Sequence, residues 1–172
     1  MTDRPDPPVQ GDELAQLHGF LDFQRATLQW KAAGLDADGM RRTLPPSTLT
    51  LGGLLKHMAL VEDNWFSYFL IGNERLQPWR DFDWDADPDW EFRTAADDDP
   101  DDLRALLDDQ VARSRQLVAG LPADTLSVRR MRGDDETQAT LRWIVLHMIE
   151  EYARHNGHAD LIRESIDGQT GE

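Results

Sequence analysis

The chain has 172 residues, of which 40% are hydrophobic and 30% charged, and its formal net charge is −15 at pH 7. This length and hydrophobic content predict one folded domain, and the negative charge argues against nucleic acid and anionic membrane surfaces as partners. No cysteine is present, which excludes disulfides, a thiolate nucleophile and cysteine-ligated metals. Any thiol chemistry must therefore use a thiol supplied from outside.

The first eleven residues contain proline and aspartate but no apolar stretch. We expect a disordered or extended tail at residues 1–11, no signal peptide, and a single domain over residues 12–172. No run approaches the roughly 20 apolar residues of a membrane span. The sequence thus predicts a cytoplasmic protein that acts on a small molecule. Its oligomeric state stays open, with a homodimer among the options.

Four segments carry apolar residues at the spacing of amphipathic helices. Each has a polar residue suited to cap its first turn, and the third also has Pro100 at the position where proline suits a helix start. The sequence therefore predicts an all-α protein. The expected helices span residues 12–33, 50–71, 99–119 and 140–166.

The links between these helices differ in length. Residues 34–49 contain glycines and prolines and should be irregular, and residues 123–139 should form a turn or a short hairpin with no catalytic role. The link at residues 73–99 is long enough to run back along a helix of roughly 33 Å. The second and third helices could therefore point the same way, which a short loop would forbid.

The long link alternates aspartate with tryptophan, most clearly over residues 79–92. Clustered aspartates could bind calcium, but the Asp-x-Asp-x-Asp-Gly loop and its closing glutamate are missing. We therefore expect a solvated loop whose aromatic side chains hold it against the bundle.

Three polar residues on apolar stripes suggest a metal site. His57 lies between apolar residues three positions before and four after it, so it should point toward the core. Glu151 and His155 are one turn apart on one face of the last helix. A buried carboxylate without a partner costs several kcal/mol. Two imidazoles and a carboxylate on facing helices could instead hold zinc, or nickel or ferrous iron, with positions open for water or substrate.

Each of these residues could also have a purely structural role. A core-facing histidine is more often structural than a ligand, and Arg154 or Arg163 could neutralise Glu151, although both lie off its line along the helix. His147 is one turn before Glu151. It could be a fourth ligand, an acid/base group or a hydrogen-bonding neighbour of the ligands, or only a polar residue at the edge of the stripe.

We expect the remaining polar residues near these stripes to have no part in the metal site. We expect His18 to be structural, His158 to contact the surface, and Glu62 and Glu150 to be solvated. Gly157 costs about 1 kcal/mol relative to alanine inside a helix, which favours close packing of another segment beside it.

Residues 51–66 and 141–164 resemble the DinB superfamily, most closely the actinobacterial branch that includes the mini-circle proteins. The acidic, tryptophan-rich link and the C-terminal residues are similar to that branch as well. The resemblance implies a four-helix bundle of up-down-down-up topology with a divalent metal at one end. The family takes one ligand from the second helix, which matches His57, and two from the fourth, which match Glu151 and His155.

Many DinB-like proteins have histidine at both ligand positions of the fourth helix, whereas Glu151 resembles mycothiol-dependent maleylpyruvate isomerase, a relative. The Arg-Gly-Gln that follows the last ligand in many members is replaced by Asn156, Gly157 and His158. The resemblance implies a metal-dependent enzyme that uses a low-molecular-weight thiol such as mycothiol for transfer or isomerisation. A metal-dependent hydrolase and a non-enzymatic metal-binding or stress-response bundle stay as alternatives.

Overall fold

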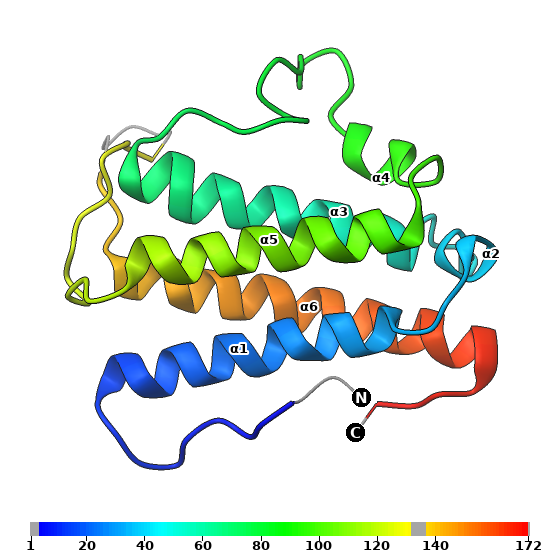
Figure 1. Ribbon diagram of the computed structural model, residues 1–172, viewed down its shortest axis with the longest axis horizontal. Helices are drawn as coiled ribbons and strands as arrows, with labels where there is room; N and C mark the ends of the chain where they lie inside the picture. Colours follow the sequence, from blue (N-terminus) through cyan, green and yellow to red (C-terminus); the bar gives the residue numbers. More distant parts are fainter. Residues whose placement is uncertain (1–3, 132–136, 172) are drawn as a thin grey trace.

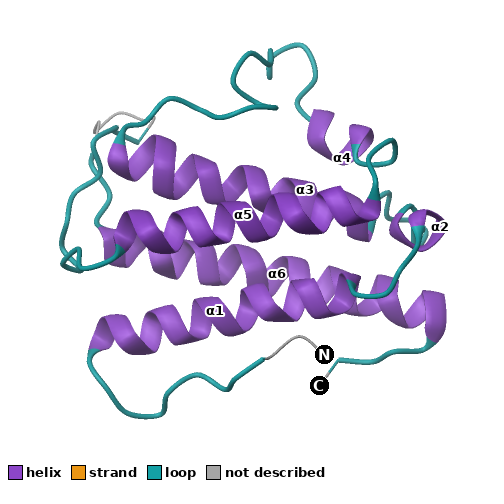
Figure 2. Ribbon diagram, in the orientation of Figure 1, coloured by secondary structure: helices purple, strands orange, loops and turns teal. Residues whose placement is uncertain are grey.

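The computed structural model describes residues 4–131 and 137–171. Within them the regular secondary structure is helical (Figure 2), which confirms the all-α prediction. One isolated antiparallel bridge joins Leu126 and Thr140. The helices are α1 (Glu13–Ala32), α2 (Ala37–Met40), α3 (Leu51–Glu62), η1 (Asp63–Ile71, a π-helix), α4 (Trp90–Thr94), α5 (Pro100–Val118) and α6 (Leu141–Asp167).

The long helices lie alongside one another (Figure 1). In that view α1 and α6 run from left to right, whereas α3 with η1, and α5, run from right to left. α1 packs mainly against α6, and α3 against α5. The segment between η1 and α4 passes over the outside of the bundle, so α3 and α5 can run in the same direction.

Capping residues set the start of each long helix, as their sequence predicts. The side chains of Asp12, Thr50, Asp99 and Thr140 each accept a hydrogen bond from a backbone N–H of the first turn, at 2.8–3.2 Å. Such bonds satisfy N–H groups that have no partner within the helix. The expected helix ends therefore agree with the structure to within one or two residues.

The link expected to be irregular, residues 34–49, and the link expected to be a solvated loop, residues 73–99, each contain a short helix. Asp36 caps α2 by accepting from the N–H of Gly39 at 2.9 Å, and α4 forms within the acidic link. Both helices are too short to show an apolar period in the sequence. The expectation of aromatic anchoring is confirmed for Trp79, which is fully buried and donates from Nε1 to Asp63 at 3.0 Å.

The prediction that Glu62 is solvated is wrong. Its side chain is 0% exposed, and its two oxygens accept from Arg25 and from the hydroxyl of Tyr152, all at 2.8 Å. Burial and the Glu62 carboxylate raise the pKa of Tyr152 well above its usual value. Glu62 follows Leu55 and Met58 by seven and four residues, so its place on the apolar stripe signalled burial.

The expected close packing at Gly157 is also wrong. Among the described residues, no atom of another segment lies within 4 Å of where its Cβ would be. At the N-terminus, the Arg4 guanidinium lies over the rings of Phe23 and Trp30 at 4.9 and 4.6 Å, so this part of the tail lies against α1.

Part of the expected 123–139 turn, residues 132–136, lies outside the described residues. Ser127 donates from its backbone N–H to Ala139 at 2.8 Å, which ties the described ends of this segment together as in a short hairpin. Among residues 4–131 and 137–171, no helix has the length and apolar character needed to span a membrane.

Candidate metal centre

His57, Glu151 and His155 come together where α3 faces α6. One nitrogen or oxygen donor from each residue lies within 4.8 Å of the donors of the other two. The rings of His57 and His155 are 5.0 Å apart, edge to face, and Glu151 Oε2 is 3.6 Å from His155 Nε2. The three residues selected from the sequence thus form one cluster, although His57 is distant from the other two in the chain.

The three side chains of the cluster are partly shielded from solvent and partly exposed to it. The exposed fractions of the side chains are 20% for His57, 22% for Glu151 and 12% for His155. Burial, together with His57 and His158, lowers the pKa of His155 to about 4, so its imidazole is neutral at pH 7. A neutral imidazole has the free lone pair that a metal ligand needs.

The short helix α4 holds His57 in place. Nδ1 of His57 lies 2.9 Å from Oε1 of Glu91, whose side chain is only 5% exposed, and the ring of Phe92 stacks on His57 at 4.6 Å. An ionised carboxylate only accepts hydrogen bonds, so an ionised Glu91 places the ring hydrogen of His57 on Nδ1 and leaves Nε2 with its lone pair. Sequence reasoning missed Glu91 because its segment was expected to be a solvated loop.

Two features of α3 let α4 come this close. A Cβ on Gly53 would lie 3.2 Å from the ring of Phe92, so a larger residue would push α4 outward. The ammonium of Lys56 donates to Thr94 at 2.9 Å and to Asp98 at 2.6 Å, which fastens the end of α4 and the residues just after it to α3. The tryptophan-rich link therefore contributes directly to the cluster.

A comparison with protein-family models matches residues 16–168 to the family described as mycothiol-S-transferase. The chain belongs to this family. The family is part of the DinB-like superfamily, which confirms the resemblance found in the sequence. No curated protein matches the chain. The match includes all of α3, α4 and α6, and hence every residue of the cluster and Glu91.

In this member of the mycothiol-S-transferase family, His147 lies next to the cluster. Its Nε2 is 3.7 Å from Oε1 of Glu151, the carboxylate oxygen that does not face His155. Its ring stacks on Trp143 at 5.1 Å and meets the edge of Trp65 at 4.6 Å. The two tryptophans thus hold His147 beside the carboxylate, close enough to exchange a proton with a molecule bound there.

The two arginines that the sequence offers as alternative partners of Glu151 bind other groups. Arg154 pairs with Glu150, which is exposed as expected, and Arg163 pairs with Asp167 at 2.8 Å and donates to backbone carbonyls of α1 and its cap. In the part of the chain that the structure describes, no lysine or arginine nitrogen lies within 4.0 Å of the Glu151 carboxylate. Within that part, its ionisable neighbours within 4.8 Å include His57, His147, His155 and the carboxylate of Glu150.

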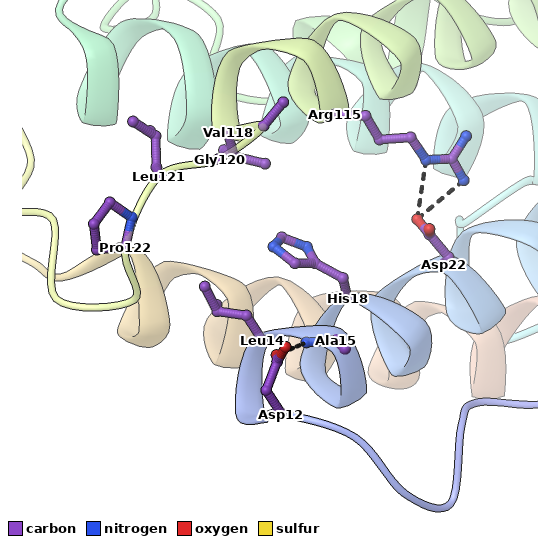
Figure 3. A pocket seen from close by; sticks show the side chains of 11 residues that line it. Asp12, Leu14, Ala15, His18, Asp22, Arg115, Val118, Gly120, Leu121 and Pro122 are labelled. Atoms are coloured by element: carbon purple, nitrogen blue, oxygen red, sulfur yellow. Dashed lines mark hydrogen bonds and ion pairs between the residues drawn. The ribbon is translucent and has the colours of Figure 1, made fainter.

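The other histidines differ in their surroundings. His158 packs edge-on against His155 at 5.5 Å, and its Nδ1 is buried without a hydrogen-bond partner among the described residues, so it is less superficial than expected. His18 points into a cavity of about 470 Å³ between the start of α1 and the end of α5 (Figure 3). There Arg115 is paired with Asp22 at 3.0 Å, so the cavity offers no cluster of ligands comparable with the one at His57.

Proposed function

We propose that this member of the mycothiol-S-transferase family is a divalent-metal-dependent enzyme that transfers a low-molecular-weight thiol of the mycothiol type to an electrophile. The thiol and the transfer reaction are supported by the family match. The observation that supports a metal is that one possible ligand atom from each of His57, Glu151 and His155 lies within 4.8 Å of the other two. Zinc suits two imidazoles and one carboxylate best, with nickel and ferrous iron as alternatives.

The residues present fit such an ion. Glu151 has no lysine or arginine partner among the described residues, and His155 is neutral. The Glu91 carboxylate orients His57, as the hydrogen-bonding neighbours of metal ligands commonly do. We further propose that the helices form an up-down-down-up four-helix bundle, which the helix directions in Figure 1 support. The cluster would then lie between one helix of each direction.

A bound divalent cation supplies Lewis acidity that lowers the pKa of a coordinated thiol. The chain holds the reacting groups around that position. His147, next to Glu151, accepts the thiol proton. The thiolate sulfur then forms a bond with an electrophilic carbon of the second substrate, and the leaving group departs with the electron pair of the bond that breaks. With no cysteine in the chain, the attacking sulfur comes from the external thiol.

Elemental analysis and activity assays test this proposal. Protein purified without an affinity tag should carry one divalent metal per chain and transfer mycothiol to a reactive electrophile. His57→Ala should lose both the metal and the transfer. His18→Ala removes a histidine remote from the cluster and should keep both. A metal-free His57→Ala protein that works as well as the wild type would disprove the metal role, and turnover that needs no thiol would indicate a hydrolase.

A further inference from the structure

A cavity of about 220 Å³ lies beside α3 and η1, close to the candidate metal centre. Its lining combines an apolar floor with two polar side chains: Leu60, Val61, Asn64, Arg75 and Trp84. Val61 follows His57 by four residues and therefore shares its helix face, about 6 Å farther along the axis. The cavity thus begins about one helical turn from a proposed metal ligand.

Arg75 is held firmly at this cavity. Its Nη2 donates to Oδ1 of Asn64 at 2.7 Å, and its guanidinium lies over the ring of Tyr68 at 4.3 Å. Across residues 4–131 and 137–171, no carboxylate oxygen lies within 4.0 Å of the Arg75 nitrogens, in a chain with 33 acidic and 18 basic residues. Burial lowers the pKa of Arg75, Tyr68 and the Asp63 carboxylate partly offset this, and the guanidinium of Arg129 lowers it further. Among the described residues, the positive charge of Arg75 therefore has no direct ion-pair partner.

The polar side chains of the cavity offer mainly donors. Asn64 uses its oxygen to accept from Arg75, so its amide nitrogen is left to donate. Arg75 has further N–H groups and no acceptor. The other side chains of the lining are apolar. A ligand that fits this lining presents acceptors alone, carries a negative charge and has an apolar body.

We propose that this cavity binds the carboxylate of an organic anion, which is the second substrate of the transferase. Arg75 and Asn64 bind the carboxylate, and the apolar body of the molecule packs against Trp84 and Val61. The assignment of the cavity as a substrate site rests on the proposed function, because it requires the electrophilic carbon of the bound anion to lie toward His57. Binding of the carboxylate itself needs neither the metal nor the thiol.

The test compares phenylacetate with phenylacetamide, which has the same shape and no charge. Binding of each to the full chain is measured by calorimetry or by ligand NMR, with no thiol added. We expect the wild type to bind phenylacetate at least about tenfold more tightly, as a charge-assisted hydrogen bond implies. Arg75→Gln should abolish this preference. Asn64→Asp should abolish it too, because the new carboxylate pairs with Arg75 and changes the side-chain shape little.

Two controls separate the possible failures. Arg42→Gln changes the net charge equally at an exposed arginine and should keep the preference, and His57→Ala should keep it because the metal is not involved. Equal binding of the two probes to the wild type would overturn the proposed carboxylate site. A preference for phenylacetate that survives both Arg75→Gln and Asn64→Asp would also overturn it, provided that the circular dichroism of these variants matches the wild type. Absence of thiol transfer with the preference intact would overturn the proposed function alone.

Discussion

Glu91 is the sharpest test of how the tryptophan-rich link supports the metal centre. In the wild type a buried, ionised carboxylate accepts from His57 Nδ1 at 2.9 Å. Glu91→Gln keeps an oxygen acceptor of the same size and removes the charge. A hydrogen bond to a charged group contributes about 1.5–3 kcal/mol and one between neutral groups about 0.5–1.5 kcal/mol. The difference, on the order of 1.4 kcal/mol, corresponds to about tenfold weaker metal binding.

Glu91→Ala removes the acceptor altogether and should weaken binding further, toward about a hundredfold. Zinc affinity is measured by competition with a chromophoric chelator at constant pH. Asp97→Asn removes an exposed carboxylate just after α4 and should leave the affinity unchanged. If both Glu91 variants bind zinc as tightly as the wild type while only their thermal stability falls, Glu91 supports the fold and does not orient His57.

Three further predictions concern stability. Glu62→Gln removes the buried carboxylate from Arg25 and leaves it paired only with the exposed Asp22 at 2.9 Å. The free energy of unfolding in urea should therefore fall by about 3 kcal/mol, the lower end for breaking a buried ion pair, and a loss below about 1 kcal/mol would contradict this account. Gly157→Ala adds a methyl group in open space on α6, so it should stabilise the protein by up to about 1 kcal/mol in thermal unfolding, and destabilisation would reveal a contact at this position. In the metal-free protein the pKa of His155 is lowered to about 4 from an ordinary 6.5, so the unfolded chain binds its proton first. The free energy of unfolding should therefore be highest above pH 6.5 and decrease as the pH falls toward 4. The decrease should be smaller in His155→Gln. Equal pH profiles for the two proteins would refute the assignment.

The helices were predictable because their signals are local. A capping side chain and its first turn are separated by two or three residues, so Asp12, Thr50, Asp99 and Thr140 could be recognised without tertiary information. The short helices α2 and α4 escaped prediction because they contain little more than one turn.

The candidate site was predictable only in part. Glu151 and His155 share a helix face by their spacing, and the family resemblance paired them with His57. Glu62 shows the limit of this reasoning, since it lies on the apolar stripe of α3 and yet was expected to be solvated. Its burial depends on an arginine 37 residues earlier in the chain.

The sequence by itself determined the all-helical class, the helix boundaries and the residues able to act as ligands, because these depend on local spacing and side-chain chemistry. Tertiary structure decided which of these groups meet. Glu91 reaches His57 only because Gly53 and Lys56 let the acidic link dock on α3. Likewise, Arg75 becomes part of a donor-lined cavity only when it folds back onto η1. Contacts between distant segments depend on how the loops close and what they bury, which no short window of sequence contains.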